Sequence, residues 1–282
     1  MIRVAELFSS ELVSIERIDH PAGAPHVDPQ EEESRHYSIN FLQAGHFGVT
    51  VGSRTWRVGS TQLFLTVPGQ VHSFTHEERH TSPADVCVAV CYKDAVESGT
   101  GGLVAALRDR PPVLSMSNRR AYLRDHLFAH LTRLDDALAI EVMAGELLEA
   151  SIESDGARLF KADQLSWYAR RVDAARQSMD ERSAANHSLT RLARDAGMSP
   201  YHFARVFREL AGIPPHQYLL RRRLRAAAAM LLEGAPITET CFAVGFRSLS
   251  HFIHTFRRAF GVAPSRFRSQ GQRGTALSPH EV

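Results

Sequence analysis

The chain has 282 residues, of which 44% are hydrophobic and 23% charged, a composition typical of a folded protein with one or two domains. No apolar run approaches the roughly 20 residues of a membrane span, and the N-terminal stretch lacks the apolar core of a signal peptide, so we expect a cytoplasmic protein without membrane contact. The 3 cysteines, Cys87, Cys91 and Cys241, are too few for a disulfide framework, and we expect buried, inert thiols rather than a redox pair.

The net charge of +2 hides a division of the chain into an acidic and a basic half. Residues 1–157 hold 13 Lys and Arg against 22 Asp and Glu, a net charge of −9, whereas residues 158–282 hold 20 against 9, a net charge of +11. This division predicts two domains with different partners. A basic domain favours a polyanion, because neutralised phosphates release counterions. A solvated basic surface without a ligand is the alternative.

Short runs of alternating apolar and polar residues fill residues 36–95 and are separated by Gly, Pro, Asn or Ser. They are HYSINFLQAG, HFGVTVGSRTWRVG, STQLFLTVPGQVHSF and DVCVAVCYKD. Strands this closely and evenly spaced predict an antiparallel barrel or sandwich, which we place at about residues 10–97. The interior of a barrel can hold a small organic molecule, although each candidate side chain has core filling as its alternative role. The candidate lining residues are Phe41, Phe47, Trp56, Phe64 and His72.

Histidines are frequent in this region and raise the alternative of a metal-dependent enzyme. They are His36, His46, His72, His76 and His80. A metal site needs clustered ligands, and no His-x-His pair occurs in these strands. We therefore predict no metal, no cofactor and no enzymatic activity.

Two helices are expected between residues 118 and 154. Leucines recur at helical spacing in AYLRDHLFAHLTRLDDAL, and the segment IEVMAGELLEASI follows. These leucines are Leu123, Leu127, Leu131, Leu134 and Leu138. Packing against the barrel is one role open to these helices. With helices at about residues 100–155, the first domain covers residues 1–155, and the polar stretch 153–164 is the candidate linker.

The basic half contains an internal repeat. SPYHFARVFRELAGIPPHQY begins at Ser199, and SLSHFIHTFRRAFGVAPSRF begins at Ser248. At an offset of 49 the two copies share Ser199/Ser248, His202/His251, Phe203/Phe252, Phe207/Phe256, Arg208/Arg257, Gly212/Gly261 and Pro215/Pro264. Upstream, the match continues at an offset of 48, where glycine aligns with glycine at 197 and 245.

Each copy predicts a short helix, a tight glycine turn and a second helix. Gly197 and Gly245 end the first helices, and Ser199 and Ser248 cap the second ones. This is the pattern of a helix-turn-helix, whose second helix enters the major groove of DNA. The segment PPHQYLLRRRLRAAAAMLLEG predicts a stiff helix that separates the two copies, so that they can reach two successive major grooves. Its arginines at 221–223 have a solvated helix face as their alternative reading.

The segments LARDAGMSPYHFARVFRELAG and RRRLRAAAAMLLEGAPITETCFAVGFRSLSHFIHTFRRAFGVAPSRFR resemble the DNA-binding domain of AraC/XylS-type transcriptional regulators over about residues 165–268. The resemblance implies a bacterial, sequence-specific DNA-binding regulator. Its domain at 165–270 would hold two helix-turn-helix units joined by a helix, and residues 271–282 would form a flexible tail. The pattern G.F.V.VG..TWRVG..QLFL.VPGQVHSF is similar to the cupin domain that precedes this DNA-binding domain in many such regulators. The expected fold is therefore a two-domain α+β protein with an N-terminal cupin-like barrel and an all-α C-terminal domain.

The resemblance also implies which side chains face DNA. The base-facing positions are Tyr201, Ala204, Arg205, Leu249, Ser250, His251, Ile253 and His254. Arg205 is the strongest candidate, since arginine donates two hydrogen bonds to guanine, whereas the apolar residues of the second helix suit thymine methyl groups and DNA shape. Arg208, Arg257 and Arg258 suit phosphate contacts, which position the protein without reading sequence.

The partners that the resemblance implies are double-stranded DNA, a small-molecule effector in the barrel, RNA polymerase and a second copy of the chain. The resemblance assigns the pairing of two copies to the helices between residues 118 and 154, with packing against the barrel as their equal alternative. Two alternatives differ in the role of the barrel. One is a metal-dependent cupin enzyme with a DNA-binding tail, and the other is a regulator that binds no small molecule.

Overall fold

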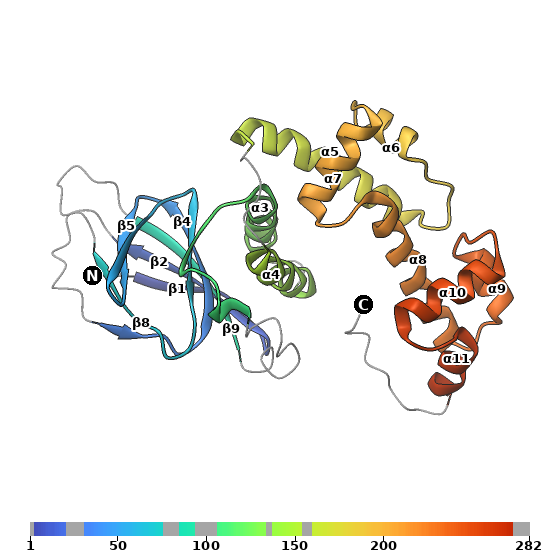
Figure 1. Cartoon of the computed structure of the whole chain (residues 1–282), viewed down its shortest axis with the longest axis horizontal. Coiled ribbons are helices and arrows are strands. Elements are labelled where there is room, and N and C mark those ends of the chain that lie inside the picture. The colour runs from blue at the N-terminus through green and yellow to red at the C-terminus, as the bar shows by residue number, and fades with distance from the viewer. Residues whose placement is uncertain are drawn as a thin grey trace. The chain divides into compact units, whose positions relative to one another are not determined.

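The computed structural model describes residues 3–20, 31–75, 85–93, 106–133, 137–153 and 160–272. The chain divides into two compact units, Met1–Phe160 and Lys161–Val282 (Figure 1). Residues 154–159 of the expected linker, Leu134, and the tail beyond residue 272 lie outside the described residues. Among the described residues, no helix is long and apolar enough to cross a membrane.

The N-terminal unit contains two antiparallel sheets, which confirms the expected antiparallel barrel or sandwich (Figure 1). One sheet has the strand order β1-β2-β9-β4-β7-β10, and the other has the order β3-β8-β5-β6. The strands are β1 (Arg3–Ser9), β2 (Val13–His20), β3 (Glu32–Glu33), β4 (Tyr37–Ala44), β5 (Phe47–Val51), β6 (Arg54–Val58), β7 (Gln62–Thr66), β8 (Val71–Thr75), β9 (Asp85–Tyr92) and β10 (Val113–Ser115).

Strand register decides which side chains of the larger sheet face the smaller one. Leu42 pairs with Cys87, and both belong to an apolar cluster that also contains Phe47 and Val49 of the smaller sheet. Residues directly opposite each other in an antiparallel ladder point to the same face, and their sequence neighbours point to the other. The cluster residues therefore form the interior between the two sheets.

The opposite face of the larger sheet packs against two helices, α3 (Asn118–Arg133) and α4 (Ala137–Ile152). The ring of Phe41 on β4 meets the ring of Phe128 on α3 edge-on, with centroids 6.4 Å apart. The hydroxyl of Tyr92 on β9 donates to the main-chain oxygen of Ala144 on α4 at 2.8 Å. Packing on the barrel is thus one role of these helices.

Arg120 joins α3 to the end of α4 from a fully buried position. Its Nε donates to the main-chain oxygen of Ala150 at 3.0 Å, and its Nη2 donates to that of Glu153 at 3.1 Å. Its Nη1 donates to the main-chain oxygen of Ser115 at 2.7 Å. A cation at the end of a helix also interacts favourably with the helix dipole, so this arginine stabilises the C-terminal end of α4.

The C-terminal unit is all helical. Its helices are α5 (Ala162–Glu181), α6 (Leu189–Asp195), α7 (Pro200–Ala211), α8 (Pro215–Leu232), α9 (Ile237–Ala243), α10 (Leu249–Phe260) and α11 (Pro264–Gln272). The helices α6 with α7 and α9 with α10 are the two expected helix-turn-helix units. The last helix extends two residues into the segment that the sequence assigned to a tail.

The two units begin and end their second helices in the same way. The Oγ of Ser199 accepts from the amide of His202, and the Oγ of Ser248 accepts from the amide of His251, each at 3.4 Å. Glycines with left-handed φ angles end both helices. One apolar stripe of each helix packs inward, as helical spacing requires: Phe203, Val206, Phe207 and Leu210 of α7 are buried, as are Phe252 and Phe256 of α10, whereas Phe260 is half-buried.

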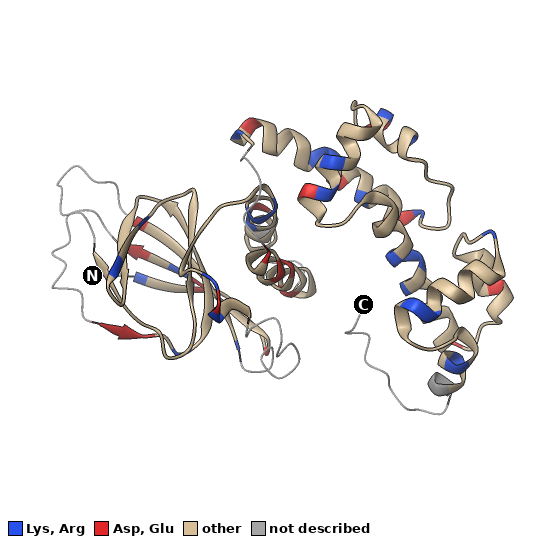
Figure 2. Ribbon diagram, in the orientation of Figure 1, with Lys and Arg blue, Asp and Glu red and all other residues tan. Residues whose placement is uncertain are grey.

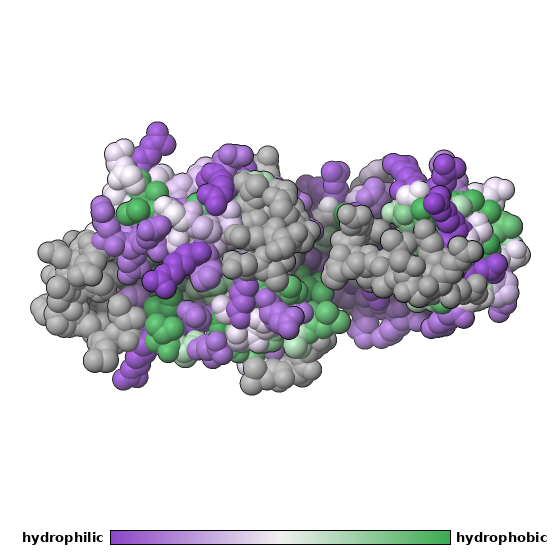
Figure 3. All heavy atoms as spheres, turned by 90° about the horizontal axis from the view of Figure 1, so that it is seen from below, coloured by the Kyte–Doolittle hydropathy of each residue, from purple (hydrophilic) through white to green (hydrophobic). Residues whose placement is uncertain are grey.

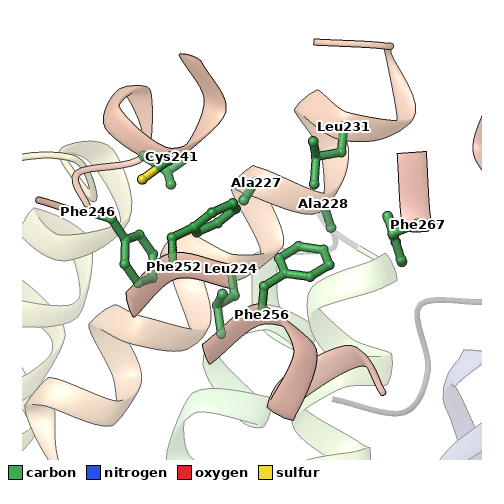
Figure 4. Packing of buried hydrophobic residues seen from close by; sticks show 10 residues of the cluster. Leu224, Ala227, Ala228, Leu231, Cys241, Phe246, Phe252, Phe256 and Phe267 are labelled. Atoms are coloured by element: carbon green, nitrogen blue, oxygen red, sulfur yellow. The ribbon is translucent and has the colours of Figure 1, made fainter. Parts of the chain in front are cut away.

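The helix α8 belongs to both units. Near its start, the ring of Tyr218 lies 5.7 Å from that of Phe207 on α7. Further along, Leu224 and Leu231 are buried in a cluster with Phe252 and other residues of α9, α10 and α11 (Figure 4). A helix that enters two cores has little freedom to bend or rotate between them.

Candidate nucleic-acid interface

The helices α7 and α10 present exposed polar and aromatic side chains on the faces opposite their buried stripes. Tyr201 is 91% exposed, more than any other large apolar or aromatic side chain of the described residues. The other exposed candidates are Arg205, Arg208, Ser250, His251, Ile253, His254, Arg257 and Arg258. Both second helices are therefore accessible to a partner. In Figure 3, hydrophilic residues cover much of the visible, described surface of the C-terminal unit, with smaller apolar groups among them.

Two candidates are less accessible than the resemblance implies. Ala204 is half-buried, and Leu249 is half-buried against the apolar cluster of the second unit. A side chain that packs on its own core offers only part of its surface to a thymine methyl group. The contribution of Leu249 to base contacts is thus smaller than that of Ile253.

The two aligned histidines have aromatic partners within the protein. His202 lies beside Tyr168 of α5, with its Nε2 3.1 Å from the tyrosine hydroxyl. The ring of His251 lies 5.6 Å from that of Phe246, which is buried under α10. Each histidine thus packs against an aromatic residue at the start of its helix, a contact that the sequence alignment alone did not show. His251 is nevertheless exposed and keeps an edge for DNA.

The arginines on α7 and α10 differ in their partners from those on α8. In the described part of the chain, no hydrogen bond or ion pair engages the guanidinium of Arg205, Arg208 or Arg257. On α8, by contrast, Arg222 forms an ion pair with Asp180, with Nε 2.7 Å from the carboxylate oxygen. Figure 2 shows Arg residues on both α8 and α10. The guanidinium groups of the arginines on α7 and α10 are therefore available to bind phosphates and bases.

Arg223 on α8 is likewise engaged within the protein. Its Nε donates to the main-chain oxygen of Ser183 at 2.7 Å, and its Nη2 donates to that of Ala185 at 2.8 Å. The pKa of Arg223 is lowered by burial and by the nearby charge of Arg247. The interpretation of residues 221–223 as an ordinary solvated face is therefore wrong for Arg223 and holds for Arg221, which is exposed, while Arg222 is partly exposed and ion-paired.

The interior of the N-terminal barrel contains four of the five predicted lining residues. Phe47, Phe64 and the half-buried Trp56 belong to or pack on the interior cluster. Phe41 does not line the interior, because it pairs with Leu63 on the face that packs against α3. A shift of one residue along a strand places a side chain on the other face, and the sequence pattern did not show which face was interior.

His72 lies inside the barrel among aromatic rings. Its centroid is 5.4 Å from that of Phe64 and 4.9 Å from that of Phe74. Its Nδ1 lies 3.3 Å from the Oγ of Ser34 and 3.4 Å from the main-chain oxygen of Gln70. Burial is the main cause that lowers the pKa of His72, which favours a neutral imidazole. Sequence reasoning missed Phe74, although its position two residues after His72 on one strand predicts the same face.

Polar side chains adjoin the aromatic rings inside the barrel. The Nδ2 of Asn40 donates to the Oγ of Ser38 at 2.8 Å and to the main-chain oxygen of Phe64 at 3.0 Å. The hydroxyls of Ser38 and Thr66 are 2.7 Å apart. The interior thus combines aromatic surface with a few oriented polar groups, the combination that small-molecule sites use.

Metal ligands are not clustered within the described ranges, where no group of three or more His, Cys, Asp or Glu residues is placed to hold a metal ion. His46 lies on the barrel with its Nε2 2.7 Å from a guanidinium nitrogen of Arg57. His76 and His80 lie outside the described residues. All three cysteines are free thiols, and burial raises the pKa of Cys87 to about 12 and that of Cys91 to about 11, so neither is a ready nucleophile.

Two helix-turn-helix units joined by one shared helix, each with an accessible second helix, define a double helix-turn-helix protein. Residues 192–270 match the family model described as a helix-turn-helix domain. The probable transcriptional regulator LumQ of Photobacterium leiognathi is 28% identical over 182 residues, which cover 61% of this chain and 73% of LumQ.

Two further relatives are transcriptional activators. The virulence regulon transcriptional activator VirF of Yersinia enterocolitica is 30% identical over 159 residues, or 56% of each chain, so the chain spans about half of that relative. The XylDLEGF operon transcriptional activator of Pseudomonas putida is 37% identical over 93 residues, which cover 32% of this chain and 29% of the relative. The chain carries an AraC-type helix-turn-helix domain and is a relative of the DNA-binding transcriptional regulators of the AraC family.

Proposed function

We propose that this protein is a sequence-specific DNA-binding transcriptional regulator that places α7 and α10 in two successive major-groove segments. The observation that supports the proposal best is the duplication itself. Both second helices begin at a capping serine, bury their aromatic stripes and leave the opposite face open. A buried second helix in either unit would have left no surface for a base edge.

The two helices have unequal roles in this proposal. On α7, Arg205 donates to guanine O6 and N7, and Tyr201 and Ala204 contact neighbouring bases. On α10, Ile253 contacts thymine methyl groups, with Leu249, Ser250, His251 and His254 beside it. The phosphate contacts are those of Arg208, Arg257 and Arg258, whose guanidinium groups have no partner among the described residues.

The barrel is the proposed site of a small-molecule effector. The side chains proposed to line this site are Phe47, Trp56, Phe64 and His72, together with Phe74, which packs beside His72. We expect no enzymatic reaction there, and we expect RNA polymerase and a second copy of the chain as further partners. A bacterial regulator of this kind acts in the cytoplasm, where the chromosome lies.

The experiment that tests the DNA-binding proposal is selection of bound duplexes from a random library by the full chain, followed by titration at several salt concentrations. We expect an enriched sequence that spans two segments about one helical turn apart and an affinity that falls steeply with salt. Exposed Arg54 on β6, in the other compact unit, offers a control, because Arg54→Ala should leave the enriched sequence unchanged. A full chain that retards no duplex at low salt contradicts the proposal.

A further inference from the structure

The turn of the second helix-turn-helix unit packs closely against the loop of residues 182–188, which connects α5 to α6. Gly245 in that turn has a φ of +89°, and a Cβ at this position would lie 2.5 Å from the main-chain oxygen of Ala184 and 2.9 Å from its Cα. Both contact atoms belong to the backbone and cannot swing away. Glycine is therefore required here for close approach as well as for conformation.

The aligned glycine of the first unit lacks this contact. Gly197 has a φ of +65°, but a Cβ there would meet no atom within 4 Å. The duplication thus preserved the backbone conformation of the turn in both copies, whereas only the second copy has become a contact surface. The difference singles out Gly245 as part of a junction between segments that are about 60 residues apart in the chain.

Arg223 holds the same loop from the side of α8. Its two hydrogen bonds end on the carbonyl groups of Ser183 and Ala185, the residues on either side of Ala184. The end of α5 is also tied to α8, since Asp180 accepts from the hydroxyl of Tyr218 at 3.0 Å. We call Ala184, Arg223 and Gly245 the inter-unit junction, because they lie between the two helix-turn-helix units of the C-terminal part of the chain.

The junction adds contacts between two helix-turn-helix units that α8 already joins. Arg223 directly precedes Leu224, which is buried in the core of the second unit, so its backbone is anchored beside that core. The loop at 182–188 leads directly into α6 of the first unit. Contacts on both sides of Ala184 therefore restrict rotation of one unit relative to the other.

We propose that the inter-unit junction fixes the distance and angle between α7 and α10, and thereby the spacing between the two DNA segments that the protein accepts. The inference rests on the proposed DNA-binding function and names positioning residues for it. One base pair inserted between the segments moves the second by about 3.4 Å and turns it by about 35°. A rigid pair of units cannot follow that change, whereas a loosened pair can.

The first test measures spacing tolerance. The probes are a duplex selected by the full chain and versions with one base pair inserted or deleted between its two protected segments. We expect the wild type to lose about tenfold or more in affinity for the altered spacings, and Arg223→Ala to lose only about two- to threefold. Arg221→Ala is the matched control, because it removes the same charge from an exposed neighbour on α8. It should keep the wild-type ratio of affinities for the selected and the altered spacings.

The second test uses the glycine pair. Gly245→Ala should reduce the spacing discrimination as Arg223→Ala does, because the added methyl group displaces the loop. Gly197→Ala introduces the same left-handed strain without the contact, and it should lower stability while keeping the discrimination. The proposal would be overturned if the ratio of affinities for the selected and the altered spacing were the same in the wild type, Arg223→Ala and Gly245→Ala.

The third test does not depend on DNA. Spin labels on Thr190→Cys of α6 and Glu239→Cys of α9, both exposed positions, report the distance between the units in a Cys91→Ala background. We expect a narrow distance distribution that broadens in Arg223→Ala and stays narrow in Arg221→Ala. If the full chain bound no duplex, the proposed DNA-binding function would be wrong. The distance measurement would still test whether the junction holds the two helix-turn-helix units in place. A distribution equally broad with and without Arg223 would reject it.

Discussion

The hydroxyl of Tyr92 on β9 donates a 2.8 Å hydrogen bond to the main-chain oxygen of Ala144 in the middle of α4. Both groups are buried, and the pKa of Tyr92 is raised, chiefly by burial, so the hydroxyl keeps its proton. The bond ties the larger sheet to the helix that covers it. Two elements about 50 residues apart in sequence are thus joined by one polar contact inside an apolar layer.

Removal of the Tyr92 hydroxyl should weaken the N-terminal unit. We expect Tyr92→Phe to lower the free energy of unfolding by about 1–2 kcal/mol, because one buried hydrogen bond is lost without a change in packing. Urea denaturation monitored by circular dichroism measures the change. Tyr201→Phe is the control, since its side chain is 91% exposed and its hydroxyl loss should leave stability unaltered. Equal stabilities of the two variants would contradict this expectation.

Arg120 should matter more to stability than Arg124 of the same helix, which is only half-buried. We expect Arg120→Met to lower the free energy of unfolding by about 3 kcal/mol or more, because the buried main-chain oxygen of Ala150 loses its charged donor and the partly buried oxygen of Glu153 loses one of its donors. Thermal and urea denaturation measure the effect. Arg124→Met on the same helix is the control, because Arg124 pairs only with its exposed neighbour Asp125 in the described structure. A change of less than about 1 kcal/mol for Arg120→Met would refute the structural role.

Base and phosphate contacts should respond differently to substitution. Arg205→Ala should relax selection at one base position by about 1–3 kcal/mol, because a bidentate contact to guanine is lost. Arg257→Ala should weaken binding to all sequences alike and make the slope of log K against log salt shallower by about 0.9. Titration of matched and mismatched duplexes at several salt concentrations separates the two effects. Uniform weakening by Arg205→Ala would assign that arginine to the backbone instead.

His72 should make the stability of the barrel depend on pH. Its pKa in the folded protein lies below the ordinary value of 6.5, so the unfolded chain binds more protons as the pH falls through that value. The contribution of neutral His72 to stability is present above pH 6.5 and is lost as the pH falls towards the folded-state pKa. Denaturation at pH 7.5 and 5.5 (values chosen to lie about one unit on either side of the ordinary pKa) should show a smaller loss in His72→Gln than in the wild type. Parallel pH dependences of the two proteins would exclude this role.

Much of the architecture was predictable because it depends on local rules. The serine caps and glycine turns of both helix-turn-helix units act within one or two turns of a helix, and the aromatic stripes follow from helical periodicity alone. The antiparallel sheets follow from alternation and turn residues. The accessible faces of α7 and α10, and with them the exposure of Arg205, follow from the same periodicity.

Other properties depend on which distant segments meet, and local sequence does not encode that. The face on which Phe41 lies was decided by strand register. The engagement of Arg222 and Arg223 was decided by the approach of α5 and the loop that follows it to α8. The sequence alone determined that glycine recurs at positions 197 and 245, because both turns need a left-handed residue. Only the tertiary structure decided that one of the two also meets the backbone of Ala184, since close approach is a property of folded segments and not of the turn itself.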